Sequence, residues 1–132
     1  MSTVNDEASA PRKIRDRGQA AVEFALALPL VVLLMLGLVQ LVVVVRDQLA
    51  VELAAREAAR AASVSATPAS AATRAARSAT ALTPLTVTAS VASDRVSVTV
   101  RHRTGTDVAL IGAFIADVDL EATVTMAREP PP

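Results

Sequence analysis

The pattern of hydrophobic and polar positions divides the chain into four stretches. Residues 1–18 are polar, and residues 24–45 carry no charge and a single strongly polar side chain, Gln40. From residue 46 to about residue 63, charged side chains return at helical spacing, and beyond Pro84 valines and leucines alternate with threonines and serines. A period of 3.6 residues followed by a period of two predicts an α+β fold in which a long helix precedes a sheet.

The apolar run predicts a membrane-spanning helix over residues 24–45. Its 22 residues would extend about 33 Å as a helix, against a hydrocarbon core of about 30 Å. Inside lipid the segment must be helical to satisfy its backbone groups, and we expect Pro29 to be tolerated there with a local kink. The run is longer than the roughly 7–15 apolar residues of a cleaved signal peptide. A small-residue motif, Ala25-Leu26-Ala27, stands at its start and not after it.

The charges on the two sides of this run predict its orientation. A basic cluster precedes the run, whereas the residues after it are mixed in sign, beginning Arg46-Asp47. The excess of basic residues predicts a cytoplasmic N-terminus, so that residues 46–132 lie outside a cytoplasmic membrane crossed once. The cluster consists of Arg12, Lys13, Arg15 and Arg17.

The helix is expected to begin near Gln19 and to continue as a stem to about Ser63. Glu52 and Arg56 form a favourable pair one turn apart, and alanine-rich turns extend the helix. Gln40 either bonds to another helix or faces protein as a tolerated polar residue. An apolar stripe at three- and four-residue spacing follows Val42, Val45, Leu49 and Leu53.

Small residues recur at every fourth position of this helix. Such rows allow close approach of helix backbones, but a high alanine content alone also produces them, and this second explanation is the one that we favour from the sequence. The rows comprise Ala21 and Ala25, then Ala54, Ala58 and Ala62.

Beyond the stem, residues 67–132 predict a small α+β domain. Thr67-Pro68 ends the stem, Ala69–Ala81 reads as a short helix, and a Ser-Asp turn joins the first two of three antiparallel strands. The sheet would lean on the stem. We expect Ser97–Arg101 to offer a strand edge to another subunit. The strands are expected at 85–91, 96–100 and 118–126, with 108–115 ambiguous between a helix and a buried loop and a proline-rich tail at the end.

Composition narrows the class of function. The chain has no cysteine, tryptophan or tyrosine, which excludes disulfides and leaves a core of alanine and valine that buries little area. Residues 46–132 hold nine arginines and nine acidic residues, so no charge excess favours a nucleic acid.

No constellation of catalytic residues or metal ligands is apparent, and we predict no cofactor and no enzymatic activity. His102, between Arg101 and Arg103, is expected to be a surface histidine. Three acids that alternate along the last strand predict a solvated face, because they lack the glycine-bearing loop of a calcium site. They are Asp117, Asp119 and Glu121.

The junction between leader and apolar run carries the strongest functional signal. One interpretation of Glu23 is simply an acid that favours the positive end of a helix dipole. Alternatively, cleavage after Gly18 would create a free amino group on Gln19, four residues before Glu23, and such a group on a neighbouring chain would neutralise the carboxylate. A glycine before the cleaved bond allows a protease to approach the backbone closely.

The stretch from Arg17 to Pro29 resembles the N-terminal signature of TadE-like minor pilins, or pseudopilins, of tight-adherence (Flp-type) pilus assembly systems. The resemblance covers about 30 residues. It implies cleavage between Gly18 and Gln19 by a prepilin peptidase, and a role for Glu23 in packing with other pilins at an inner-membrane assembly platform. Phe24 matches the aromatic residue that follows the glutamate in this class. Gln19 replaces the phenylalanine usual in type IV pilins, so N-methylation is not implied.

Together these features predict three regions: a cleaved leader (1–18), a membrane and stem helix (19–66), and an extracytoplasmic domain (67–132). Two other functions stay open. An unprocessed signal-anchored protein with a partner-binding domain would keep its leader and tolerate loss of Glu23. A membrane-bound hydrolase would depend on a site such as His102.

Overall fold

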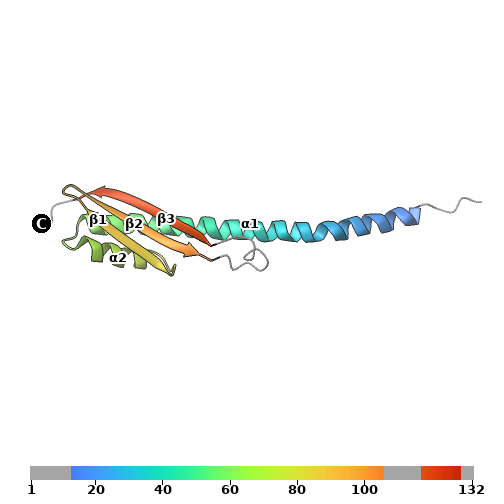
Figure 1. Ribbon diagram of the computed structural model, residues 1–132, viewed down its shortest axis with the longest axis horizontal. Coiled ribbons are helices and arrows are strands. Elements are labelled where there is room, and N and C mark those ends of the chain that lie inside the picture. The colour runs from blue at the N-terminus through green and yellow to red at the C-terminus, as the bar shows by residue number, and fades with distance from the viewer. Residues whose placement is uncertain (1–12, 106–116, 129–132) are drawn as a thin grey trace, which may run out of the picture. The chain divides into compact units, whose positions relative to one another are not determined.

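The computed structural model describes the backbone of residues 13–105 and 117–128, with side chains from Gly18 onward. The expectations for residues 1–12, for 108–115 and for the proline tail lie outside these ranges. The chain divides into two units, residues 1–35 and 36–132, which are considered separately. The elements are α1 (Lys13–Ser63), α2 (Pro68–Ala79), β1 (Leu85–Val91), β2 (Arg95–Thr104) and β3 (Val118–Ala127) (Figure 1).

Helix α1 ends at Ser63, as predicted, but it begins at Lys13 and not near Gln19. The prediction of a start near Gln19 is therefore wrong. Lys13, Arg15 and Arg17 are good helix formers, and the one glycine at position 18 costs only about 1 kcal/mol. The helix continues through Pro29; the kink expected there stays a prediction.

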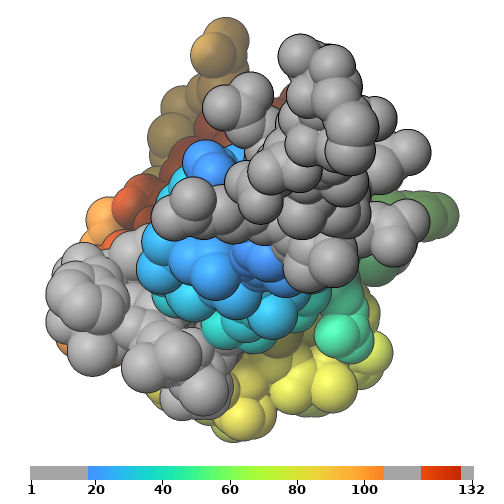
Figure 2. Space-filling view, turned by 90° about the vertical axis from the view of Figure 1, so that its right-hand side faces the viewer, coloured from blue at the N-terminus to red at the C-terminus, as the bar shows by residue number. Residues whose placement is uncertain are grey.

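In the first unit the apolar side chains of α1 are exposed. Phe24 is 71% and Leu26 is 75% exposed, and the blue and cyan side chains of the helix lie at the surface seen in Figure 2. Over Gly18–Ser63, α1 is long and apolar enough to cross a membrane by length and composition. A helix surface this apolar is usually covered by lipid or by other helices.

The second unit is a two-layer α/β arrangement. The C-terminal half of α1 and the short helix α2 cover one face of an antiparallel sheet with the order β1-β2-β3 (Figure 1). The alternation of valines with polar residues places every second side chain of β2 in the core. The buried cluster consists of Val51, Ala54, Ala55, Ala58, Ala59, Ala62, Ala72, Ala76, Val96, Val98, Val100 and Leu120.

The alanines of α1 form a packing face. Ala54, Ala58 and Ala62 are all fully buried against the unit's own core, so explaining this row by alanine content alone is wrong. Short side chains let the helix approach the sheet closely, and the branched valines of β2 fill the space between them. We call this set of helix alanines, with Ala55 and Ala59, the alanine layer.

The apolar stripe predicted on the stem lies outside this core. Its members Val42, Val45, Leu49 and Leu53 are between 49% and 66% exposed. The helix thus buries its alanines and Val51 and leaves these four larger apolar side chains uncovered by the sheet. We call these four residues the exposed stripe.

The strand order corrects the expected position of the sheet edge. Strand β2 pairs with β1 on one side and with β3 on the other, so Ser97–Arg101 is in the centre of the sheet and cannot offer a free edge. The prediction was wrong because β3, which follows a long connection, returns beside β2. Among the described strands, β1 and β3 are the edges.

Candidate functional site

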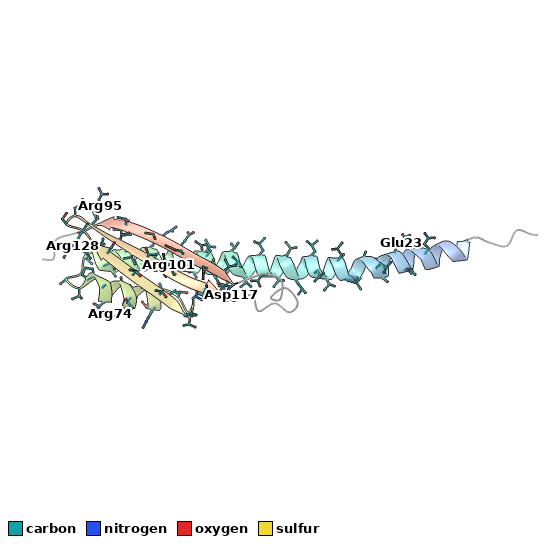
Figure 3. The ribbon with its side chains drawn as sticks, in the orientation of Figure 1. Glu23, Arg74, Arg95, Arg101, Asp117 and Arg128 are labelled. Atoms are coloured by element: carbon teal, nitrogen blue, oxygen red, sulfur yellow. The ribbon has the colours of Figure 1, made fainter. Side chains whose placement is uncertain are left out.

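The predicted cleavage and packing residues lie together on the first described turns of α1. Gln19 Nε2 donates a hydrogen bond to Glu23 Oε1 at 3.2 Å, so the two side chains share one side of the helix. Both residues are exposed, and Glu23 projects from the helix in Figure 3. The backbone of residue 19, which cleavage would make the new N-terminus, is one helical turn from the carboxylate.

Nothing in the described part of the chain requires a glycine at position 18. A Cβ atom built at this position meets nothing within 4 Å, and its backbone does not adopt a positive φ. Glycine nevertheless weakens a helix by about 1 kcal/mol relative to alanine. Packing and backbone conformation therefore do not explain the glycine, which leaves access to the backbone as a reason for it.

The leader charges are only partly described. Arg12 lies outside the described residues, whereas Lys13, Arg15 and Arg17 belong to the first turns of α1. Pro29 lies about three turns further along the same helix. The sequence predicted that these residues flank or belong to one helix. The described ones all lie in α1.

A comparison with protein families matches this same segment. The family model described as TadE-like protein matches residues 18–60. The segment is TadE-like. The match confirms the resemblance seen in the N-terminal motif, and it suggests a protein associated with Tad pili. Neither the comparison with curated proteins nor that with solved structures found a match.

The TadE-like segment covers 43 of the 132 residues and lies entirely within α1. It begins at Gly18, spans the apolar run and ends within the alanine layer. The match therefore includes Gly18, Gln19, Glu23 and Phe24 but not α2 or the sheet. Among the residues that the structure describes, one helix is long and apolar enough to span a membrane, which fits a membrane-anchored protein of this kind.

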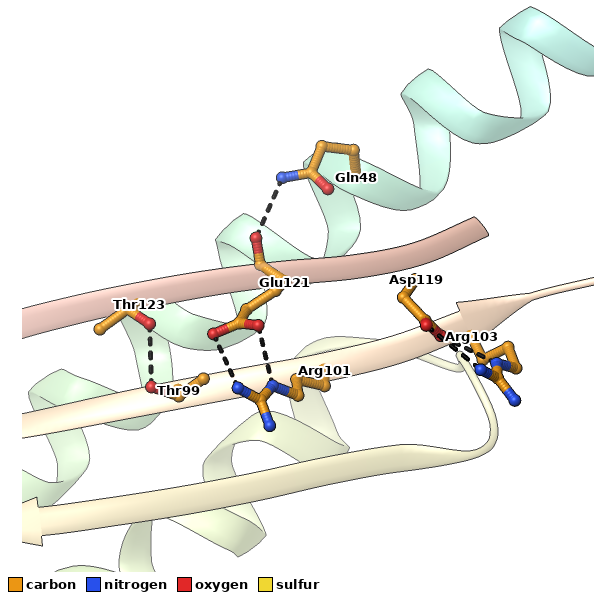
Figure 4. Close-up of polar contacts among 7 residues, drawn as sticks. All are labelled: Gln48, Thr99, Arg101, Arg103, Asp119, Glu121 and Thr123. Carbon is orange, nitrogen blue, oxygen red and sulfur yellow. Dashed lines mark hydrogen bonds and ion pairs between the residues drawn. The ribbon is translucent and has the colours of Figure 1, made fainter. Parts of the chain in front are cut away.

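The outer face of the sheet carries ordered polar pairs. Arg101 donates to both carboxylate oxygens of Glu121, at 2.8 and 3.2 Å, and Arg103 binds Asp119 with the same two distances. Thr99 and Thr123 are joined at 2.8 Å in the next row (Figure 4). The solvated acidic face was predicted correctly, but its arginine partners were missed. Their signal was Arg101 and Arg103 at the same period of two on the adjacent strand.

His102 is not the surface residue that the sequence predicted. It is 7% exposed, and its Nδ1 lies 2.8 Å from the carbonyl oxygen of Pro84. Because that oxygen only accepts, Nδ1 carries the proton and the ring ties β2 to the residue before β1. The two arginines beside it point to the opposite face of the strand. Among the described residues, no three histidine, aspartate or glutamate side chains form a group able to hold a metal.

The Arg103–Asp119 pair predicts a small dependence of stability on acid. The hydrogen bond from Arg103 lowers the pKa of Asp119 below its ordinary value of 3.8. A lowered pKa in the folded state means that the contribution is present above about pH 4 and is lost as the pH falls below it. Because the pair is exposed, we expect Asp119→Asn to lower the melting temperature only slightly at pH 7 and not at all at pH 2. Thermal denaturation of both proteins at the two pH values checks this; an equal difference at both would contradict it.

Proposed function

We propose that this chain is a minor pilin or pseudopilin of a Flp-type pilus assembly system. In this proposal a prepilin peptidase cleaves it between Gly18 and Gln19, and the mature chain joins other pilins at an inner-membrane assembly platform. The observation that carries the proposal is the pairing of Gly18, which packing does not require, with Glu23 one turn beyond the cleavage point. Both lie in the TadE-like segment, at the head of an exposed apolar helix.

The membrane orientation is part of this proposal. The leader arginines and lysine would stay in the cytoplasm, where the peptidase acts, and the sheet domain would lie outside. The lipid bilayer is then the first partner of the helix. Incorporation into a pilus would exchange lipid contacts for contacts with other helices.

Glu23 has a physical role in that exchange. A carboxylate at the edge of the hydrocarbon region is costly unless a positive group or hydrogen-bond donors accompany it. Cleavage supplies a positive amino terminus, and a neighbouring chain can place this group beside Glu23. The carboxylate would thereby set the axial register between neighbouring helices.

The exposed stripe favours a protein that assembles with other chains over a signal-anchored protein that stays single. Leu49 and Leu53 lie beyond the predicted membrane span, where lipid cannot cover them, and they are 61% and 49% exposed. Neighbouring large apolar side chains left at the surface mark interaction sites. The helices of other pilins are partners of the matching kind.

We propose a structural role and no catalysis. The chain would act as the substrate of the peptidase and as a packing unit. His102 has a structural role of its own, because its Nδ1 bonds to the Pro84 carbonyl and joins β2 to the start of β1.

The test is the N-terminal sequence and intact mass of the membrane-extracted chain, from cells with and without the prepilin peptidase. We expect a chain that begins at Gln19 only when the peptidase is present. Gly18→Leu should leave the full-length chain in both strains, because the larger side chain blocks approach to the bond. Gly37→Leu is the matched control, since Gly37 is a second helical glycine with open space around it.

The same experiment separates the alternative function. A full-length chain in both strains, with Gly18→Leu and wild type alike, would contradict the proposed processing. It would leave an unprocessed signal-anchored protein whose outer domain binds a partner.

A further inference from the structure

The two edge strands of the sheet run in the same direction. Strands β1 and β3 each pair antiparallel with β2, so they are parallel to one another. At the end of β2, Thr104 Oγ1 donates a hydrogen bond to Asp47 Oδ2 at 3.2 Å, and Asp47 follows the apolar run by two residues. Strand β2 therefore runs toward the predicted membrane span, and both edge strands run away from it (Figure 1).

Within the described part of the chain, no further strand pairs with the outer side of either edge. Strand β3 is the longer edge, with ten residues, and it contains no proline, lysine or arginine that would hinder pairing. A groove of about 270 Å³ lies between it and the side chains of Gln48 and Glu52 on α1. Gln48 Nε2 is 3.5 Å from the carbonyl oxygen of Glu121, so this oxygen is on the outer side of β3 (Figure 4). An edge of this kind is a template for strand addition.

The apolar face of the sheet is incompletely covered at both edges. In the central strand, Val96, Val98 and Val100 are fully buried, whereas most inward side chains of β1 and β3 are only partly buried. A further strand beside each edge would cover them, since neighbouring strands lie about 4.8 Å apart. The partly buried residues are Leu85, Val87, Ala89, Val118, Ala122, Val124 and Met126.

A shared membrane orientation limits how two copies of this sheet can pair. Copies of one orientation bring together either unlike edges, β3 with β1, or two like edges. Pairing of like edges requires a half-turn of one copy about the strand direction, which places the apolar face of one sheet beside the polar face of the other. Pairing of unlike edges keeps both helix layers on the same side. It also continues the apolar and the polar face from one copy to the next.

The charges of the two edges favour the same pairing. Strand β3 carries Asp119 and Glu121 and no basic residue. Strand β1 has no charged residue, and α2, which packs on it, carries Arg74 and Arg77 and no acid. Two β3 edges would bring the acids of two chains together, and like charges on facing strands are destabilising. A β3 edge beside a β1 edge avoids this repulsion.

We propose that copies of this chain join by strand addition, with β1 of one copy pairing in parallel with β3 of the next. The occupant of the β3 edge is thus a second copy of the chain, and the sheets join into one mixed sheet, a common type among large sheets. Because each joined pair keeps one free β1 and one free β3, the contact is head-to-tail and extends beyond two chains. The inference rests on the membrane orientation and assembly of the proposed function.

The test introduces one cysteine on each edge of the full-length chain, which has no cysteine of its own. Thr88 and Thr123 are exposed and lie opposite the same residue of β2, Thr99. Within one copy they are two strand spacings apart, about 10 Å, which is too far for a disulfide. Oxidation of the Thr88→Cys/Thr123→Cys variant in the membranes of its native cells should therefore link separate copies into a ladder of dimers, trimers and larger products.

Either cysteine alone is the matched control and should give no dimer, because the contact joins unlike edges. Thr86 and Ser90 are exposed on the same face of β1 as Thr88. Thr86→Cys/Thr123→Cys and Ser90→Cys/Thr123→Cys therefore detect a register shifted by two residues. We expect a ladder from one of the three double variants. Its absence from all three, with protease resistance showing that the domains are folded, would overturn the inference, and so would dimers from a single-cysteine variant.

Cleavage at Gly18 is measured on the same samples by intact mass. A ladder formed by full-length chains would support the pairing of edges and contradict the proposed processing. Cleaved chains without a ladder would support the processing and contradict the pairing. The two proposals can therefore fail independently.

Discussion

Replacing Val98 by aspartate is expected to unfold the sheet domain. Val98 is fully buried in the central strand, opposite Ala89 on β1 and Val124 on β3. Burial of an unpaired carboxylate costs several kcal/mol even after relaxation. Small domains have only about 5–15 kcal/mol of stability, and this one has a core of alanine and valine. The cost of the substitution is therefore comparable to the whole stability of the domain.

The effect is measured as resistance of the detergent-solubilised chain to proteolysis within residues 85–127, together with its melting temperature. Thr88→Asp is the control, because Thr88 is exposed on the edge strand β1 and faces away from the helices. We expect Thr88→Asp to melt close to wild type and Val98→Asp to show no cooperative transition. A cooperative transition at the wild-type temperature for Val98→Asp would contradict the two-layer arrangement.

Replacing Glu23 by alanine is expected to abolish assembly while leaving cleavage and membrane insertion intact. A carboxylate about 4 Å from an amino terminus gains about 4 kcal/mol at an effective dielectric constant of 20. Loss of such a contact would weaken association between neighbouring chains more than tenfold. The measurements are the amount of pili sheared from cells and the co-purification of this chain with other pilins.

Glu52→Ala is the matched control, since Glu52 is an acid of the same helix whose partner Arg56 is in its own chain. We expect it to assemble as wild type does. If the Glu23→Ala variant assembled fully, the only role left for the Glu23 carboxylate would be its favourable interaction with the helix dipole. Loss of cleavage in the same variant would place the role of Glu23 in peptidase recognition instead.

The elements of the fold were predictable because their periods are clear. The alternation from Leu85 to Val91 predicted β1 at its observed bounds, and the alternation at Val118 predicted β3. The order of the strands was not predictable from alternation, which is the same for an edge strand as for a central one. For that reason Ser97–Arg101 was placed at an edge and not in the middle of the sheet.

Two side-chain environments were misjudged for different reasons. His102 was assigned to the surface because arginines flank it, yet it has the same parity as Val96, Val98 and Val100, and this parity places it inward. The alanine layer was underrated because alanine is only weakly apolar and common in this chain. Whether such a row of alanines is a packing face depends on the element that lies against it, and the local sequence does not identify that element.

The candidate site was predictable to the extent that it is local. Gly18, Gln19 and Glu23 lie within six residues of one another, and a helix fixes their arrangement. The hydrogen bond between Asp47 and Thr104 could not be predicted, because it joins α1 to a strand residue 57 positions further along the chain. Only the docking of the sheet on α1 creates it.

The alanine layer has a consequence for how this protein can change over generations. A single nucleotide change turns an alanine codon into one for valine, threonine, serine, proline, glycine, aspartate or glutamate. All of these except glycine are larger, and glycine and proline weaken a helix. At positions such as Ala54 and Ala58, which have no exposed surface, each larger side chain overpacks the core. One-step mutation therefore offers these positions few neutral alternatives, whereas the hydroxyl-bearing outer face of the sheet is free to drift.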